Sequence, residues 1–363
     1  MRIRHLFAGG VVLSLAVSLP PGAMARGGPG QARPQHDPGA GLPASLHETG
    51  LYAPGSNATI APDVIAFSPQ YPLWSDGADK RRWLWLPPGS RIDASRPDQW
   101  EFPPGTRLWK QFEYAGQPVE TRFIERQADG SWRFATYVWD DAKRSAVLAP
   151  AEGVKAVAVQ GAPQGRYALP SRMDCLACHG SAAVPVLGLS AVQLSGTRDP
   201  LAPGGKPRGT AEADLRALVA RGVLVKLPEA MLTSPPAIAG STPVERAALG
   251  YLHANCGHCH NSSPNRVSVR LTLAQRAGDP AASRLEVLRA TVDANGRWRA
   301  QSDEEAPIVS PGKSAQSLLV QRMQSRDPLR QMPPLGTQVT DAQALALLSA
   351  WINDLSPRKE GHR

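Results

Sequence analysis

Two copies of a five-residue pattern, Cys-x-x-Cys-His, use every cysteine in this chain. Residues 175–179 are Cys-Leu-Ala-Cys-His, and residues 256–260 are Cys-Gly-His-Cys-His. The 363 residues contain four cysteines, so none is left for another role. Any fold of this chain must hold each cysteine pair together with the histidine that follows it.

This pattern is typical of covalent haem attachment. Two thiols add across the two vinyl groups of one haem, and a gap of two residues lets both thiols reach the same ring edge. The next residue then lies under the ring, where the imidazole of His179 or His260 can bind iron. The sequence therefore predicts two haem c groups, bonded through thioethers to Cys175, Cys178, Cys256 and Cys259.

Three other uses of the cysteines compete with haem. A four-thiolate zinc site is one, but 77 residues separate the two pairs, against about 15–20 in zinc ribbons. Zinc also gives no reason for a histidine after each pair. Thioredoxin-like chemistry needs a single motif in a βαβ setting, and two disulfides would suit an oxidising compartment. The doubled motif together with an export signal favours haem, because bacteria attach haem to this motif after translocation.

The N-terminus has the pattern of a secretory signal peptide. Arg2 and Arg4 precede an apolar stretch, residues 6–19, and Ala-Met-Ala ending at Ala25 is a small-x-small cleavage pattern. We expect residues 1–25 to be removed and the mature protein to be periplasmic. The apolar stretch is short for a membrane anchor. No later segment is apolar for long enough, so we expect no transmembrane segment after signal removal.

The chain is basic, with a formal net charge of +9. Its lysines and arginines are scattered and form no basic run interleaved with aromatic residues, so we expect no nucleic-acid partner. A solvated surface is the simplest interpretation. A basic face could also steer an acidic redox partner, and redox partner proteins are the partners that we expect.

Sequence patterns around the second motif predict helices on both sides of it. Thr242, Pro243 and Glu245 suit the N-cap, the first turn and a capping box. Apolar residues at helical spacing follow and lead to the first cysteine. Residues 340–343 form a second capping box before a last helix. Between them, residues 332–336 are Met-Pro-Pro-Leu-Gly; a thioether suits the sixth position of haem iron, although most methionines fill cores.

This order of a helix, Cys-x-x-Cys-His, Met-Pro-Pro and a closing helix with Trp351 resembles the class I cytochrome c family. The resemblance covers roughly residues 240–357. It implies an all-α domain whose first and last helices pack crosswise, with His260 as the proximal and Met332 as the distal iron ligand. The stretch after His260 is longer than in small cytochromes, which predicts an insertion with a helix at residues 283–290.

The first motif lies in no comparable module, so its sixth ligand stays open. Met231 is the candidate that we carry forward, because it is well separated from the motif and Pro-Pro follows closely, although core packing is the commoner role. Met173, His253, His258 and Met323 are weaker candidates. A ligand from the N-terminal domain, or an open sixth position, is also compatible with the sequence.

The N-terminal part has a different character, since residues 44–165 hold seven of the nine tryptophans. Residues 107–114, 120–126 and 132–139 are predicted strands, the last two joined by an Ala-Asp-Gly turn. Tryptophans at strand spacing are more often core than cofactor contacts. The fold class that we predict is multidomain, with an N-terminal mostly-β, sandwich-like domain followed by α-helical, cytochrome c-like haem regions.

The expected organisation has five segments. They are a signal peptide (1–25), a disordered leader (26–43), a β-rich domain (44–165), a first haem segment (166–238) and a cytochrome c-like domain with the second haem (239–358).

The chain also resembles, over roughly residues 45–357, a poorly characterised proteobacterial group of dihaem cytochromes. The shared segments are Tyr-Pro-Leu-Trp-Ser-Asp-Gly at 71–77, Phe-Pro-Pro-Gly-Thr at 102–106 and Glu-Thr-Arg at 120–122, followed by the two haem motifs. This resemblance supports the domain order but implies little about function. We assign no chemistry to the polar residues in or near these segments, Asp76, Lys80 and Glu120.

Three functions fit these features. The first, which we favour, is periplasmic electron transfer by two covalently bound c-type haems. The second is a dihaem, peroxidase-like oxidoreductase with an open or weakly ligated first haem. In the third, the β domain binds a substrate or partner and the haems accept its electrons. A sixth ligand on the first haem favours a carrier. A vacant face lined by His, Glu or Arg favours an enzyme, and a deep aromatic cleft favours the third function.

Overall fold

The computed structural model of this protein describes residues 41–263, 267, 269, 271–296 and 306–356. The predicted signal peptide and all but the last three residues of the predicted leader lie outside the described residues. None of the helices in the described part combines the length and the apolar character needed to cross a membrane.

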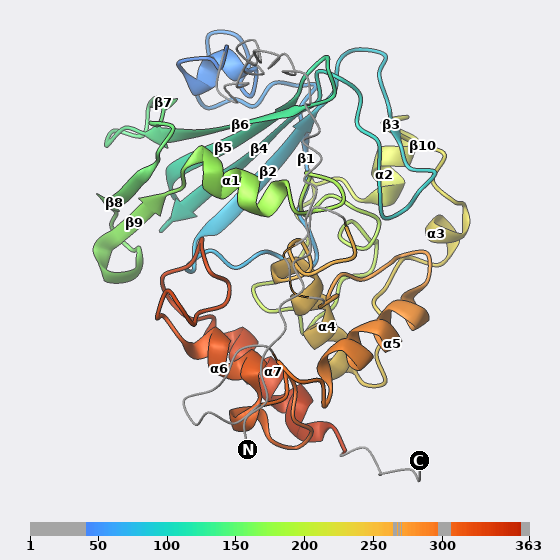
Figure 1. The fold of residues 1–363 in the computed structure, drawn as a ribbon. Helices are drawn as coiled ribbons and strands as arrows, with labels where there is room; N and C mark the ends of the chain where they lie inside the picture. Colours follow the sequence, from blue (N-terminus) through green and yellow to red (C-terminus); the bar gives the residue numbers. More distant parts are fainter. Residues whose placement is uncertain (1–40, 264–266, 268, 270, 297–305, 357–363) are drawn as a thin grey trace, which may run out of the picture. The chain divides into compact units, whose positions relative to one another are not determined.

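An antiparallel sheet of six strands dominates the N-terminal part, in the order β1-β2-β4-β5-β6-β7 (Figure 1). The three strands predicted from the sequence are present as β4, β5 and β6, and β5 begins three residues earlier than expected. The strands are β1 (Ile65–Ala66), β2 (Asp79–Trp85), β4 (Arg107–Tyr114), β5 (Gln117–Arg126), β6 (Trp132–Trp139) and β7 (Ala146–Leu148).

Two small sheets accompany the large one. β3 (Ile92–Asp93) pairs in parallel with β10 (Leu224–Val225), and β8 (Val154–Ala158) pairs antiparallel with β9 (Arg166–Leu169). The mostly-β character is confirmed, but in place of the expected sandwich-like arrangement the described residues form one six-stranded sheet with two small sheets.

The two faces of the large sheet bury different residues, because side chains alternate along a strand. One face carries an aromatic core in which Trp83, Trp109 and Phe123 are cross-strand neighbours. The 3₁₀-helix η1 (Leu46–Thr49) covers this core with the fully buried Leu46. The other face is the one on which α1 (Arg172–His179) lies in Figure 1.

After α1 the described chain contains helices joined by long irregular segments. They are α2 (Leu215–Ala220), α3 (Ala230–Thr233), α4 (Pro243–Asn255), α5 (Pro280–Thr291), α6 (Leu318–Gln324) and α7 (Ala342–Asp354). In Figure 1, α2 and α3 lie beside the sheet and α4 to α7 lie below it. The predicted fold class is confirmed: a mostly-β region comes first and helices follow. The helix expected at residues 283–290 is present as α5.

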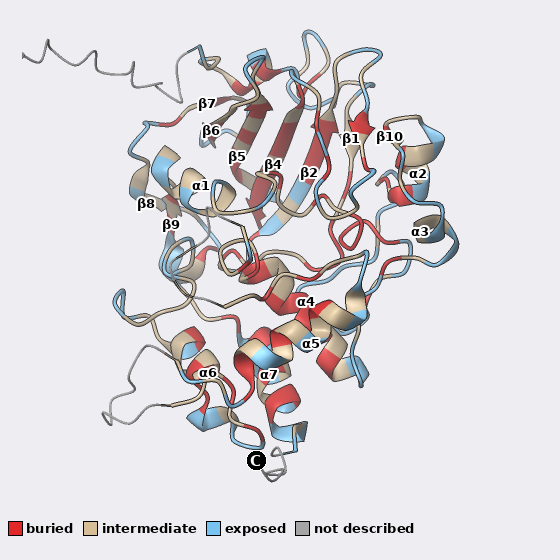
Figure 2. Ribbon diagram, turned by 45° about the vertical axis from the view of Figure 1, so that its right-hand side comes forward, coloured by how far each residue is buried: buried red, intermediate tan, exposed pale blue. Residues whose placement is uncertain are grey.

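Helices α4 and α7 share a core, and both carry buried residues in Figure 2. Leu252, Leu348 and Trp351 of this core are almost fully buried. The Thr242 hydroxyl caps α4 by accepting from Glu245 N at 3.1 Å, as predicted. The Glu245 carboxylate, however, binds Ser241 and Arg284, so the predicted reciprocal half of the capping box is not formed at Thr242. The N-cap of α7 is Asp341, one residue later than expected.

Tyr71 joins the sheet region to this helical core. Its hydroxyl donates to Asp199 Oδ2 at 2.9 Å, and its ring packs on α4 at Gly250. A Cβ atom built on Gly250 would lie 2.0 Å from Tyr71 Cε1, closer than any real contact. Glycine at this position therefore allows the N-terminal segment to approach the helix.

We expect Gly250→Ala to destabilise the protein by about 1–3 kcal/mol, because the added methyl group overpacks the Tyr71 contact. At an exposed helix position the same change would stabilise the protein by about 1 kcal/mol. The sign of the change in unfolding free energy therefore shows whether Tyr71 packs on Gly250. Urea unfolding of the mature protein measures it. In a Tyr71→Ala background the penalty should disappear, whereas stabilisation by Gly250→Ala alone would refute the contact.

Candidate functional site

The first Cys-x-x-Cys-His motif forms the C-terminal part of α1. Ser171 caps this helix: its hydroxyl accepts from Asp174 N at 3.1 Å, and the Asp174 carboxylate accepts from Ser171 N at 2.9 Å. This complete capping box stabilises a helix of only eight residues. Helical spacing places Cys175 and Cys178 on one side of α1, with His179 one turn after Cys175.

His179 is held in a defined tautomer. Its Nδ1 lies 2.6 Å from the carbonyl oxygen of Pro185, which can only accept, so Nδ1–H donates and Nε2 is left available to bind a metal. Burial lowers the pKa of His179 to about 4, which keeps the ring neutral at neutral pH. Its ring centroid lies 5.1 Å from that of Phe134 on β6, so the sheet fixes its position.

The second motif turns sharply at the end of α4. Cys259 N and His260 N both donate to the Cys256 carbonyl, at 3.1 and 2.8 Å. Leu273 N donates to the His260 carbonyl at 2.8 Å and fixes the backbone there. Burial lowers the pKa of His260, and no described residue gives its buried Nδ1 a hydrogen-bond partner.

The two motifs meet in space, although they are far apart in the sequence. Cys259 Sγ lies 3.9 Å from the carbonyl oxygen of Ala177, inside the first motif. Asn261 Nδ2 donates to Ser181 O at 3.2 Å just beyond both motifs. A hydrogen bond with the Cys259 thiol raises the pKa of Cys178 to about 12, and burial adds to this effect. The sequence contains no signal that predicts this approach.

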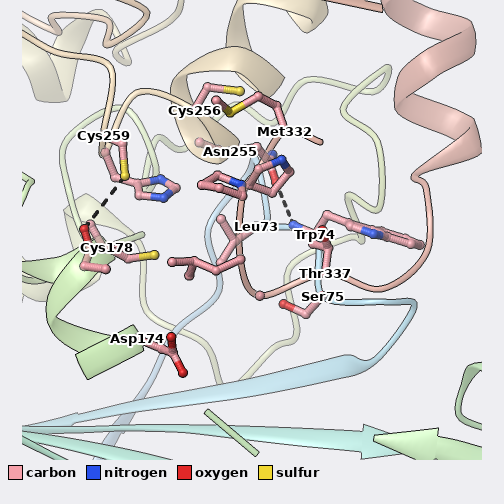
Figure 3. Close-up of a pocket in the computed structure, with 18 of the residues that line it drawn as sticks. Leu73, Trp74, Ser75, Asp174, Cys178, Asn255, Cys256, Cys259, Met332 and Thr337 are labelled. Carbon is pink, nitrogen blue, oxygen red and sulfur yellow. Dashed lines mark hydrogen bonds between the residues drawn. The ribbon is translucent and has the colours of Figure 1, made fainter. Parts of the chain in front are cut away.

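One cavity of about 1310 Å³ lies against both motifs. It is larger than the roughly 300–1,000 Å³ of a typical small-molecule site. Figure 3 shows Cys178 and Cys259 on one side of the view, with Cys256 and Met332 drawn together above. The predicted haem residues that line the cavity are Cys175, Cys178, His179, Cys256, Cys259, His260 and Met332.

The loop that carries Met332 is held by a segment to which the sequence assigned no role. The Asp76 carboxylate accepts from Gln338 N at 2.9 Å and from Val339 N at 3.0 Å. Trp74 Nε1 donates to Val339 O at 3.2 Å. Residues 71–77 therefore position the methionine loop. The signal in the sequence was the polar-aromatic segment Tyr-Pro-Leu-Trp-Ser-Asp-Gly itself, which gave no indication of its partners.

The same segment also contacts the helix before the second motif. Trp74 N donates to Asn255 Oδ1 at 2.7 Å, and Asn255 Nδ2 donates to Pro72 O at 3.3 Å. Asn255 is the last residue of α4 and directly precedes Cys256. Residues 71–77 thus form hydrogen bonds both with the end of α4, which precedes the second motif, and with the methionine loop.

The structure separates the candidate sixth ligands of the first site. Met231 does not line the cavity; it lies on α3, half-buried against the apolar cluster around Leu215 and Leu218. Met173 is 69% exposed. His253 also lies outside the cavity lining, and its Nδ1 accepts from Gln275 N at 3.0 Å. His258 and Met323 do line the cavity, so the fold brings these two, and not Met231, to the site.

The donor set fits haem better than the alternatives considered for the cysteines. All four cysteines are free thiols. Within the part of the chain that the structure describes, no group of three His, Cys, Asp or Glu side chains is arranged to hold a metal ion. Two thiol pairs, two imidazoles and a thioether around one large cavity suit two covalently held haems.

A family model described as Planctomycete cytochrome C matches residues 290–336. The match runs from the end of α5 through α6 to the Met332 loop and contains neither Cys-x-x-Cys-His motif. Neither the curated proteins nor the solved structures contain a match to the chain.

The C-terminal region is therefore cytochrome c-like. This assignment supports covalently bound haem c, electron transfer by haem, and redox partner proteins in general. Met332 and the Arg322 carbonyl that accepts from Met332 N at 2.9 Å both lie within the matched segment.

We expect Asp76→Gly to loosen the methionine loop, because glycine keeps the left-handed backbone at this position (φ 51°) but removes the carboxylate. Hydrogen bonds to a charged group contribute about 1.5–3 kcal/mol, so amide exchange at Gln338 and Val339 should rise roughly ten- to hundredfold. Hydrogen-exchange mass spectrometry measures this. Asp76→Asn, which retains an acceptor oxygen, is the matched control and should show a smaller change. Unchanged exchange in Asp76→Gly would rule out the positioning role.

Proposed function

We propose that this protein is an exported, periplasmic dihaem cytochrome c that transfers electrons between redox partner proteins. The observation that carries the proposal is the single cavity onto which both Cys-x-x-Cys-His motifs and Met332 open. The expected cleavage near Ala25 and the resemblance to a dihaem group are consistent with it. We also propose the domain order that the sequence predicts, with a β-rich domain before the two haem regions.

Each attachment site has its own set of residues. Cys175 and Cys178 would form the thioether bonds of the first site, and Cys256 and Cys259 those of the second. His179 Nε2 would be the proximal ligand of the first site. His260 and Met332 would be the axial ligands of the second, a Met/His pair that favours a high reduction potential. Haem c, when bound, supplies reversible one-electron chemistry.

The protein itself would position the two haem attachment sites and exclude water from them. The Cys259–Ala177 contact keeps the two attachment sites adjacent, so an electron accepted at one site is close to the other. Apolar side chains of the helical region surround the second site, among them Leu271, Leu273, Ile308, Leu318 and Leu319. A low-dielectric surrounding of this kind disfavours the more highly charged state of a metal site and so raises its potential.

A second candidate function is a dihaem oxidoreductase with an open first site. Arg122 and Tyr167, two polar side chains, line the cavity. Arg122 lies close enough to Cys175 to interact with its thiol electrostatically. Such groups could bind or protonate a small oxidant if no side chain of this protein takes the sixth position. His258 and Met323 also line the cavity, and either side chain could take the sixth position instead.

Haem content is the first test. The mature protein, made with a working haem-maturation system, should have an intact mass that includes two haems. Cys175→Ala/Cys178→Ala and Cys256→Ala/Cys259→Ala should each remove one haem and keep the other, because the two sites are separate in the chain. If the intact mass of the wild-type protein equals that of the polypeptide without haem, the haem proposal is wrong.

Carbon monoxide distinguishes the two functions. The reduced wild-type protein should bind none if both irons are six-coordinate, and absorption spectra would record this. Met332→Leu removes a ligand without adding a polar group, so carbon monoxide should then bind at one haem, and the reduction potential of that haem should fall. Binding at one haem of the wild-type protein would instead favour the oxidoreductase.

A further inference from the structure

Three cationic side chains stand opposite one another across the sheet. Arg82 on β2 pairs with Lys110 on β4, and Lys110 pairs with Arg122 on β5. Residues directly opposite on antiparallel strands point to the same face, with Cβ atoms about 4.5–5.5 Å apart. Like charges in such positions destabilise a sheet unless an anion lies nearby. We call these three residues the cationic row.

The cationic row lies on the sheet face that carries the first motif. Arg122 and Ile124 are two residues apart on β5, so they share a face, and Ile124 pairs with Phe134 on β6. Phe134 contacts the ring of His179. All three cations line the same cavity as the cysteines and histidines of both motifs.

The charge of the row is only partly compensated by the protein. Arg122 forms an ion pair with the buried Glu120 at 2.6 Å, and Tyr167 donates to the same carboxylate oxygen. Glu212 attracts Arg82, but its carboxylate also accepts from Ser68 and from a backbone amide.

Lys110 is the central member of the row. Among the described residues its ammonium group has no hydrogen bond or ion pair, and it lies 4.8 Å from the centroid of the Phe112 ring. Burial lowers the pKa of Lys110, the neighbouring cations lower it further, and Glu120 partly opposes them. Two of the carboxylates that line the cavity are engaged elsewhere: Asp76 holds the methionine loop and Asp174 caps α1.

We propose that Arg82, Lys110 and Arg122 form a carboxylate-binding site beside the first Cys-x-x-Cys-His motif, with Lys110 as its central cation. The inference rests on the proposed function, because it assumes that a haem is attached at Cys175 and Cys178. Guanidinium groups bind carboxylates in a fixed, often bidentate geometry, and the lysine adds a point charge. The carboxylate is either a propionate of that haem or a diffusible small carboxylic acid.

The experiment uses the holoprotein, after intact mass has confirmed two haems. The variants are Lys110→Gln and Arg82→Gln. The control is Arg91→Gln, which removes an equal charge from an exposed position outside the cavity. One measurement is the midpoint potential of each haem by spectroelectrochemical titration, and the other is calorimetric titration of the oxidised protein with succinate.

The two sources of the carboxylate give different results. If a propionate occupies the site, Lys110→Gln lowers the potential of one haem because a cation that favours the reduced state is lost, and the wild type does not bind succinate. If the ligand is diffusible, the wild type binds succinate, and each row variant binds it roughly tenfold more weakly or worse. Arg91→Gln should resemble the wild type in both measurements.

The inference is overturned if both row variants match Arg91→Gln in potential and in succinate binding. Removing one of three adjacent like charges should not prevent folding, which thermal unfolding checks. If Lys110→Gln fails to fold, Arg82→Gln decides the question by the same two measurements. Absence of haem from the protein would refute the proposed function instead, so the two failures are distinguishable.

Discussion

The contact between the two Cys-x-x-Cys-His motifs is the constraint on which the rest of this structure depends. Cys259 Sγ and the Ala177 carbonyl are 82 positions apart in the sequence and 3.9 Å apart in space. The two motifs belong to different parts of the fold: the first ends a helix that lies on the sheet, and the second forms a turn at the end of α4. The sheet and the helical core must therefore dock accurately for one cavity to receive both sets of ligands.

Residues 71–77 form the main contacts that join the sheet region to the helical core. Tyr71 is buried against Gly250 and donates to Asp199, which also forms an ion pair with Arg246 of α4 at 2.9 Å. Trp74 and Asp76 then bind the end of α4 and the methionine loop. Buried polar contacts of this kind specify one arrangement, because any other leaves desolvated groups unpaired. The same contacts that hold the fold thus also set the position of Met332.

The sheet performs two different tasks on its two faces. The face covered by η1 holds an aromatic core and supplies stability. The face towards α1 exposes the cationic row to the cavity, where like charges lower stability unless a ligand compensates them. The proposed binding role would explain why three adjacent cations are retained there, since lower stability in exchange for function is common at functional sites. This face is thus the part of the β region best suited to act on whatever the cavity holds.

Local patterns in the sequence were enough for some parts of this protein. The Cys-x-x-Cys-His spacing, the strands β4 to β6, and the helices α4 and α7 all follow from contacts within a few residues along the chain. The eight-residue helix α1 was not predicted, although Ser171 and Asp174 form its capping box, because the helix is short and packs on the sheet. The role of Asp76 was equally hidden, since its partners lie more than 260 positions away.

The sequence by itself determined which thiols and imidazoles are grouped, and that a methionine loop lies between the second motif and the last helix. Only the tertiary structure decided that both groups open onto one cavity, that Met231 lies outside it, and that Arg82, Lys110 and Arg122 face it. The reason is physical. Periodicity and capping act over about four residues, whereas a cavity is formed by segments that meet only after the chain has folded.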